Sequence, residues 1–221
     1  MAFRTELEPI LDRIVAETLE HPMVAGLGDG SLDTEPFERW VRQDYYYLTE
    51  YNRVFALGAA KAPGLERMST FATLLEETLN TEMDLHRAYA AEFGITEAEL
   101  ESTDPSPTTQ GYTDFLVRTA AHGTFGDLVA ALLPCMWGFR ETGLRLDEQG
   151  RPDDERYAEW IETYSSDSFG ELTEWCKTLM DDLAADADPE TRSRYRDRFR
   201  TSMRYEYLFW DAAWRGEEWP V

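Results

Sequence analysis

Apolar side chains recur at helical spacing along most of the sequence, and this pattern restricts the possible folds more than any other feature. Near the N-terminus, Leu7, Leu11 and Ile14 share one face of a helix because they are four and three residues apart. No segment alternates apolar and polar residues for long enough to indicate a β-strand. The sequence therefore predicts an all-α fold.

Proline and glycine divide the helical pattern into segments. The stretch "HPMVAGLGDGSLD" (21–33) interrupts it, Thr34 is a predicted N-cap, and Pro63 and Gly64 end the helix that follows. A second long helix is expected from Leu65 to Gly94, and further helices at about 110–119, 124–144, 153–164, 166–185 and 189–215. Neither a repeat nor a linker is evident, so we expect a single domain over residues 1–221 with roughly seven or eight helices.

The net charge of −23 comes from 44 acidic and 21 basic side chains, and only Lys61 and Lys177 are lysines. Such a charge repels the phosphates of nucleic acids, so nucleic acid is not an expected partner. Two interpretations remain, an acidic protein-binding surface and adaptation to a salty cytoplasm. Acids spread along the whole chain favour salt adaptation, because molar salt shortens the Debye length to about 3 Å and screens the repulsion.

Hydrophobic segments are too short to predict a membrane span. The longest run without a charged or polar residue, 128–139, has 12 residues. The N-terminus "MAFRTELEPILDRIVAETLE" is acidic and amphipathic, unlike a signal peptide. We expect a cytoplasmic protein.

Cys135 follows Pro134 in the apolar segment "LVAALLPCMWGFRETG". A proline inside a helix frees a backbone carbonyl and favours a kink. Cys135 is then either a buried, inert thiol or a nucleophile, which would need a group that stabilises its thiolate. Cys176 is interpreted as a thiol on a helix face, and two cysteines with this spacing make neither a disulfide framework nor a zinc site.

Two acidic residues have mainly aromatic surroundings. Glu206 lies in "YEYLFW", where loss of solvation would raise its pKa and suit it to proton delivery, although an ion pair with Arg204 is an equal alternative. In "QDYYYLTEY", Asp44, Tyr47 and Tyr51 share a helix face, which suggests the lining of a cavity as readily as a packed core.

Metal and phosphate sites receive little support. Glu82 and His86 are four residues apart on one predicted helix, but the sequence lacks the Glu-x-x-His pairs of di-iron bundles. We expect His86 to form a hydrogen bond between packed helices. No glycine-rich phosphate loop is present, and neither a metal nor another cofactor is predicted. Tyr112 and Tyr164, taken singly, are ordinary half-buried tyrosines near helix ends.

Taken together, five segments resemble the TenA/thiaminase II family, and the resemblance extends over nearly the whole chain. Its most specific parts are the His-Pro loop before Gln-Asp-Tyr-x-Tyr-Leu and the Leu-Pro-Cys-x-Trp segment. The five segments, in order, are "HPMVAGLGDGSLDTEPFERWVRQDYYYL", "LNTEMDLHRAYAAEFGI", "ALLPCMWGF", "YSSDSF" and "YEYLFWDAAW". The resemblance implies a haem-oxygenase-like helical fold without haem, and a homotetramer.

The resemblance also implies a function, an aminopyrimidine hydrolase of thiamin salvage in the cysteine-containing branch. Its substrate would be 4-amino-5-aminomethyl-2-methylpyrimidine, converted with water to the hydroxymethyl pyrimidine and ammonia, with thiamin as a possible second substrate. Cys135 matches the nucleophile, Glu206 the acid that protonates the leaving amine, and Asp44 the carboxylate that binds the aminopyrimidine edge.

Four aromatic positions complete the expected site. Tyr47 matches the tyrosine that promotes thiol reactivity, and Tyr112 and Tyr164 match residues that orient the ring. Phe139 stands where many members have tyrosine, so the aromatic wall is kept and a hydroxyl contact is lost. Two alternatives of other classes are a metal-dependent oxidase on the same fold, and a regulator without catalytic activity.

Overall fold

Every regular element in residues 2–221, the part of the chain that the computed structural model describes, is helical. This confirms the predicted all-α class. The elements are α1 (Arg4–Glu20), α2 (Pro22–Asp29), α3 (Thr34–Lys61), α4 (Leu65–Glu77), the π-helical turn η1 (Thr78–Glu82), α5 (Met83–Glu92), α6 (Glu97–Glu101), α7 (Pro107–His122), α8 (Phe125–Gln149), α9 (Glu155–Ser165), α10 (Asp167–Ala185) and α11 (Pro189–Arg215).

Contacts between elements divide the described chain into two compact units. The first unit contains the residues up to Asp33 and Val129–Asp211, and the second contains Thr34–Leu128 and Ala212–Val221. The first unit therefore holds α1, α2, α9, α10 and most of α8 and α11, whereas the second holds α3 to α7.

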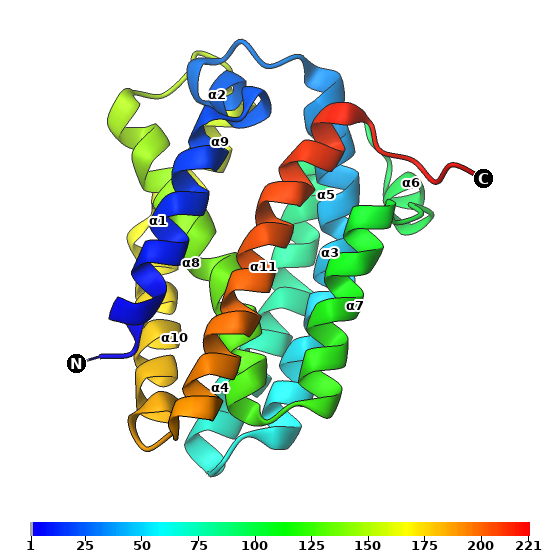
Figure 1. Cartoon of the computed structure of the whole chain (residues 1–221). Helices are drawn as coiled ribbons and strands as arrows, with labels where there is room; N and C mark the ends of the chain where they lie inside the picture. Colours follow the sequence, from blue (N-terminus) through cyan, green and yellow to red (C-terminus); the bar gives the residue numbers. More distant parts are fainter. Residues whose placement is uncertain (1) are drawn as a thin grey trace. The chain divides into compact units, whose positions relative to one another are not determined.

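In the second unit, α3 is the central helix and contacts α4, α5 and α7 (Figure 1). A Cβ atom at Gly58 would lie 2.2 Å from a ring carbon of Phe71, so glycine at this position lets α3 and α4 approach closely. The Phe71 ring also lies edge-on to Phe125, with centroids 5.3 Å apart. Burial of such rings supplies much of the apolar stabilisation of this unit.

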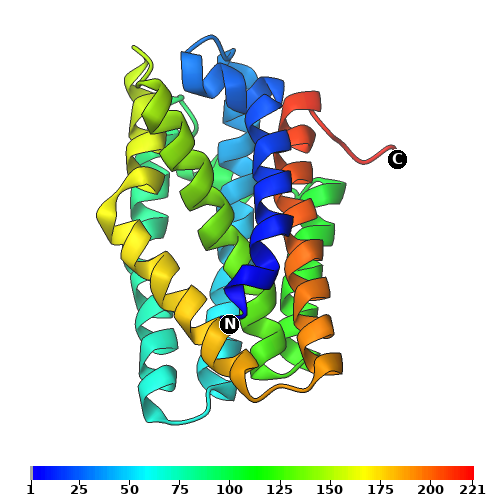
Figure 2. The same ribbon diagram turned by 60° about the vertical axis from the view of Figure 1, so that its left-hand side comes forward.

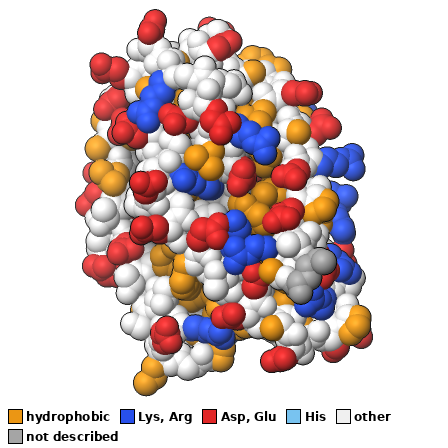
Figure 3. All heavy atoms as spheres, turned by 90° about the vertical axis from the view of Figure 1, so that its left-hand side faces the viewer, with side chains coloured by type: hydrophobic (Ala, Val, Ile, Leu, Met, Phe, Trp, Pro, Cys, Tyr) orange, Lys and Arg blue, Asp and Glu red, His pale blue; other side chains and the backbone are white. Residues whose placement is uncertain are grey.

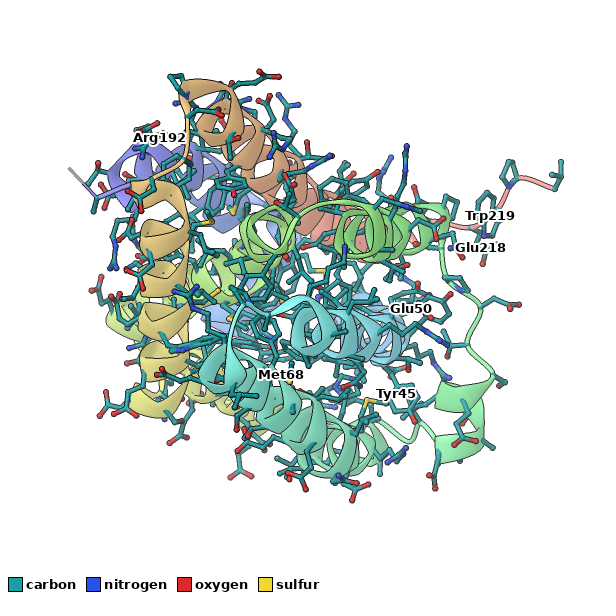
Figure 4. The ribbon with its side chains drawn as sticks, turned by 90° about the horizontal axis from the view of Figure 1, so that it is seen from below. Tyr45, Glu50, Met68, Arg192, Glu218 and Trp219 are labelled. Atoms are coloured by element: carbon teal, nitrogen blue, oxygen red, sulfur yellow. The ribbon has the colours of Figure 1, made fainter. Side chains whose placement is uncertain are left out.

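The C-terminal segment after α11 is held against the N-terminus of α7, also within the second unit. The backbone N–H of Thr108 donates to Glu217 over 2.8 Å, which places a carboxylate where the helix dipole favours negative charge. The indole N–H of Trp219, labelled in Figure 4, donates to the carbonyl of Pro105 over 2.9 Å. These two bonds connect the chain end to the helix that carries Tyr112.

In the first unit, α1 contacts α2 and α10, and α9 contacts α10. Helices α9 and α10 meet at a sharp bend, drawn in yellow in Figure 2. At this bend the Ser166 side chain accepts a hydrogen bond from the N–H of Phe169 and caps α10. The bend follows directly after Tyr164, one of the predicted site residues.

The surface mixes acidic and basic side chains, which lie interspersed on the face shown in Figure 3. In the first unit, Arg4 of α1 forms ion pairs with Asp181 and Glu174 of α10. Exposed pairs of this kind each contribute roughly 0–1 kcal/mol. None of the helices in residues 2–221 combines the length and the apolar character that crossing a membrane requires.

The predicted helices are present, and three local differences explain why the structure has more elements than expected. The segment 21–33 was expected to be irregular, but it contains α2, because the His21 ring accepts a hydrogen bond from the N–H of Met23 and Pro22 fits the first turn. The predicted helix from Leu65 to Gly94 is interrupted by η1 at Thr78–Glu82. The short α6 begins at a capping box formed by Thr96.

Candidate active site

Cys135 is partly exposed, although it lies in a stretch of α8 that is otherwise buried. Every other residue from Phe125 to Phe139 is buried, and α8 continues through Pro134 without interruption. Cys176 on α10 is fully buried, and burial raises the pKa of its thiol to about 12. Because the reactive species is the thiolate, Cys176 is unsuited to nucleophilic chemistry, whereas Cys135 is partly exposed.

Two contacts align α8 with α11 in the first unit. The Ser202 hydroxyl on α11 donates to the carbonyl of Ala131 on α8 over 2.8 Å. Two turns further along both helices, the rings of Phe139 and Trp210 lie 5.8 Å apart. The rings of Trp137 and Phe199 also lie 6.0 Å apart, so α8 packs side by side with α11 over this stretch.

Cys135 and Glu206 lie midway between those two contacts. Cys135 is one turn after Ala131, and Glu206 is one turn after Ser202, so each lies on the helix face that contacts the partner helix. The thiol and the carboxyl therefore lie on the two helix faces that pack against each other. Glu206 exposes only 6% of its surface, whereas Arg204, the expected alternative partner, is exposed.

An aromatic cluster continues from this pair along the same two helices. Phe139 packs against Tyr164, with ring centroids 4.9 Å apart, and against Trp160 at 5.9 Å. Trp160 also lies 4.6 Å from Tyr164 and 5.5 Å from Trp210. The predicted residues Phe139 and Tyr164 are thus in contact, and they form part of an aromatic wall one turn beyond the thiol and the carboxyl.

Tyr164 is held in place by contacts from α8. A Cβ atom at Gly143 would lie 2.7 Å from the Cβ and 2.9 Å from the carbonyl carbon of Tyr164, so glycine allows the end of α9 to approach. The Arg140 guanidinium donates to the carbonyls of Tyr164 and Ser166 over 3.1 and 2.7 Å. The bond to Tyr164 satisfies a carbonyl group at the C-terminal end of α9, whereas the Ser166 carbonyl also accepts the N–H of Gly170 in α10.

In the second unit, α3 presents the other predicted residues. Tyr47 packs against Tyr112 of α7, with centroids 5.2 Å apart, and stacks on Tyr51 at 5.3 Å. Asp44, one turn earlier on α3, has its carboxyl oxygen Oδ2 3.6 Å from Nδ1 of His86 on α5. Asp44 and Tyr47 therefore lie on one face of α3, and Tyr112 of α7 packs against Tyr47.

The Asp44 carboxyl has an unusual protonation state because it is poorly solvated. Burial, together with the nearby Glu82 carboxylate, raises the pKa of Asp44 to about 8. Burial also raises the pKa of Glu82, although that residue keeps part of its surface exposed, and it lowers the pKa of His86. At pH 7, Asp44 is therefore mainly a neutral acid beside a neutral imidazole.

His86 was predicted to form a hydrogen bond between packed helices, and the structure confirms this. Its Nε2 lies 2.9 Å from the carbonyl oxygen of Val41 on α3. Within residues 2–221, no group of three or more His, Cys, Asp or Glu side chains is arranged to hold a metal ion.

Several residues of the site were not predicted. Trp160, Arg140 and Gly143 shape the aromatic wall, and only the small residue at 143 was a possible sequence signal, since glycine inside a helix often marks a close approach. Glu82 was considered only as a metal ligand, and His86 as a metal ligand or a helix-packing hydrogen bonder, without Asp44 as a neighbour of either. Their proximity to Asp44 depends on the packing of α5 against α3, which no local pattern indicates.

Comparisons with known proteins give a consistent family. The family model described as TENA/THI-4/PQQC matches residues 5–216. A curated protein of Halalkalibacterium halodurans, named aminopyrimidine aminohydrolase, is 42% identical over 220 residues, which covers 99% of this chain and 98% of that protein.

Solved structures agree with this. A TenA homologue from P. horikoshii superposes with a TM-score of 0.90 at 27% identity, covering 98% of this chain and all of the other. A heme oxygenase-like domain from Shewanella denitrificans, 14% identical with a TM-score of 0.75 and coverages of 96% and 92%, shares the fold. Because the family model spans nearly the whole sequence and the curated relative is similar over its full length, this chain belongs to the TENA/THI-4/PQQC family.

Proposed function

We propose that this chain is an aminopyrimidine hydrolase. Its substrate is 4-amino-5-aminomethyl-2-methylpyrimidine, and water replaces the aminomethyl nitrogen to give the hydroxymethyl pyrimidine and ammonia. The relative that shares 42% of its residues carries the name aminopyrimidine aminohydrolase, which supports a hydrolase that acts on a C–N bond. Thiamin, which contains the same pyrimidine, is a second candidate substrate.

The observation that carries this proposal is the packing of α8 against α11, which supports a joint role for Cys135 and Glu206 on the facing sides of these helices. The Cys135 thiolate adds to the electron-poor pyrimidine ring, and the ring electrons then expel the amine from the adjacent methylene carbon. Glu206 protonates that amine as it departs, so a free amide anion is never formed. Water adds at the methylene carbon, and loss of the thiolate restores the aromatic ring.

The remaining residues bind and orient the ring. Asp44 hydrogen-bonds the amino group and ring nitrogen of the aminopyrimidine edge, and its high pKa allows it to supply a proton to that nitrogen. Tyr47 and Tyr112, which contact each other, and Phe139 and Tyr164, which also contact each other, are the aromatic side chains proposed to stack on the ring. Phe139 cannot donate a hydrogen bond, so orientation of the ring depends on the other polar groups.

The test compares the wild-type protein with Cys135→Ser and the matched control Cys176→Ala, all in concentrated KCl. Each is given the aminomethyl pyrimidine or thiamin, and ammonia and hydroxymethyl pyrimidine are measured. We expect Cys135→Ser to lose turnover, by roughly 10³-fold or more, and Cys176→Ala to keep it. Full activity of a folded Cys135→Ser variant contradicts the assignment of the nucleophile, and an inactive wild-type protein contradicts the function.

We also propose that the active form is a homotetramer. The helical run from α4 to α5 leaves large apolar side chains exposed, which supports association with further copies of the chain. These are Leu65, Met68 (labelled in Figure 4), Leu79 and Leu85, with exposed fractions of 82, 40, 49 and 65%. Light scattering coupled to size exclusion measures the mass directly, and a monomer at assay concentration refutes this proposal.

A further inference from the structure

The turn before α7 is bound by a side chain of α3. Pro105 and Pro107 have no N–H group, so only Ser106 between them can donate a backbone hydrogen bond. The Ser106 N–H donates to Oε1 of Gln43 over 2.9 Å, and Nε2 of Gln43 donates to the carbonyl oxygen of Asp104 over 3.1 Å. One side-chain amide therefore satisfies a donor and an acceptor of the same turn, both at ordinary hydrogen-bond distances.

The orientation of the Gln43 amide follows from its partners. Exchange of its nitrogen and oxygen would bring two donors together at Ser106 and two acceptors together at Asp104. Ser106 is only 7% exposed, so its N–H would be costly to leave without an acceptor. The Ser106 side chain also accepts a hydrogen bond from the N–H of Thr109 over 3.2 Å and caps α7. Gln43 thus binds the residue at which α7 begins.

Helix α7 lies along α3, and three sets of contacts join the two helices (Figure 1). Gln43 binds the start of α7, and Tyr47, one turn later on α3, packs against Tyr112 with ring centroids 5.2 Å apart. At the other end, the Lys61 ammonium donates to two carbonyl groups at the C-terminal end of α7 over 2.8 and 2.7 Å. The contact between the two tyrosines therefore lies between two polar contacts that fix where α7 lies on α3.

The C-terminal segment binds the same turn, but from a different part of the chain. Glu217 accepts the N–H of Thr108, and Trp219 donates to the carbonyl of Pro105. These bonds hold α7 to the chain end, whereas Gln43 holds it directly to α3. Gln43 is also adjacent in sequence to Asp44, so the contact is made from the part of α3 that presents the predicted site residues.

We propose that Gln43 is a positioning residue: its amide holds the start of α7 on α3 and so fixes the Tyr112 ring against Tyr47. This inference rests on the proposed function, in which Tyr112 stacks on the pyrimidine and Asp44 binds its amino edge. Gln43 itself does not touch the substrate. A shift of α7 along α3 would change the position of the Tyr112 ring relative to Asp44.

Three variants test this role. Gln43→Met has nearly the same shape and removes both bonds, whereas Gln43→Glu keeps an oxygen that can accept the N–H of Ser106. Gln110→Met is the matched control, because it removes the same amide from α7 at an exposed bond of 2.8 Å to Asp114.

Hydrogen exchange followed by mass spectrometry needs no substrate. Because of the two prolines, a peptide of residues 104–110 reports on few backbone amides, those of Ser106, Thr108, Thr109 and Gln110. In Gln43→Met, we expect the Ser106 amide to exchange roughly tenfold faster or more, because it loses its acceptor. Gln43→Glu and the control should keep this protection. Unchanged exchange in a folded Gln43→Met variant overturns the inference.

The second readout is the separation of KM from kcat. A binding group misplaced by about 1 Å can cost up to ~10²-fold, and we expect Gln43→Met to raise the KM for the aminomethyl pyrimidine roughly tenfold with a smaller change in kcat. Gln43→Glu should restore part of this loss, and Gln110→Met should leave KM unchanged. An unchanged KM in Gln43→Met despite lost protection, or an equal rise in the control, contradicts a positioning role.

A double-mutant cycle decides whether Gln43 acts through Tyr112. In a Tyr112→Ala background, Gln43→Met should raise KM no further, because the ring that it positions is absent. The same tenfold rise in both backgrounds refutes the proposed route. If the wild-type protein turns over neither substrate, the proposed function fails, and hydrogen exchange still decides whether Gln43 holds the start of α7.

Discussion

Replacing Gly143 by alanine tests whether close packing of α8 and α9 positions Tyr164. The added methyl group would lie 2.7 Å from the Cβ and 2.9 Å from the carbonyl carbon of Tyr164, and 3.1 Å from the nitrogen of Ser165. Backbone atoms cannot rotate away as the end of a flexible side chain can, so the end of α9 must shift. Overpacking of this kind costs about 1–3 kcal/mol.

Gly138 on the same helix is the matched control. A Cβ atom there would meet only the flexible end of Met203, at 3.5 Å, which is an ordinary van der Waals distance. Alanine at either position gains about 1 kcal/mol of helix propensity over glycine. The difference between the two variants therefore isolates the contact with Tyr164, and we expect Gly143→Ala to be less stable than Gly138→Ala by about 1–3 kcal/mol.

Thermal unfolding followed by circular dichroism in concentrated KCl measures this difference. For a chain of this size, about 1 kcal/mol corresponds to roughly 2–4 °C, so the two midpoints should differ by roughly 2–12 °C. We also expect a raised KM in Gly143→Ala, because Tyr164 moves with the end of α9. Equal midpoints, or a more stable Gly143→Ala, refute the conclusion that this glycine is required for close packing.

Two further predictions follow from the titratable groups. A small alkylating reagent should modify Cys135 in the native protein and leave Cys176 unmodified until unfolding, because burial raises the pKa of the Cys176 thiol to about 12. Peptide mass spectrometry distinguishes the two cysteines. Modification of Cys176 before unfolding contradicts its burial. Asp44 should contribute a decrease of up to about 1.4 kcal/mol per pH unit to the free energy of unfolding between about pH 4 and 8, since native Asp44 keeps a proton that the unfolded carboxyl loses. Asp44→Asn should lack this contribution, and denaturant unfolding that shows the same pH dependence in both proteins refutes the raised pKa.

Local patterns were sufficient for most of the fold. The spacing of Leu7, Leu11 and Ile14 and the stop at Pro63 depend on chemistry within a few residues, so they can be read from the sequence. The segment 21–33 was misjudged because proline and glycine are also compatible with a short helix capped by His21. The π-helical turn at Thr78–Glu82 has no comparable sequence signal.

The candidate site shows the same division. Sequence resemblance predicted catalytic roles for Cys135 and Glu206, and aromatic neighbours suggested a desolvated carboxyl at Glu206. The packing of α8 against α11 is visible only in tertiary contacts, such as those between Ala131 and Ser202 and between Phe139 and Trp210. Such contacts join residues far apart in the chain, and a helical pattern indicates which face is buried but not which residue it meets.

The sequence by itself determined the all-α class and most helix boundaries, because these depend on local spacing and residue chemistry. The roles of Cys135 and Glu206 were predicted from the family resemblance and stay predictions. Only the tertiary structure decided that His86 faces Asp44 and that Gly143 admits Tyr164. It also decided that the pKa of Asp44 rises to about 8, because the electrostatic environment of a carboxyl depends on which distant segments exclude water from it and which charges they bring near.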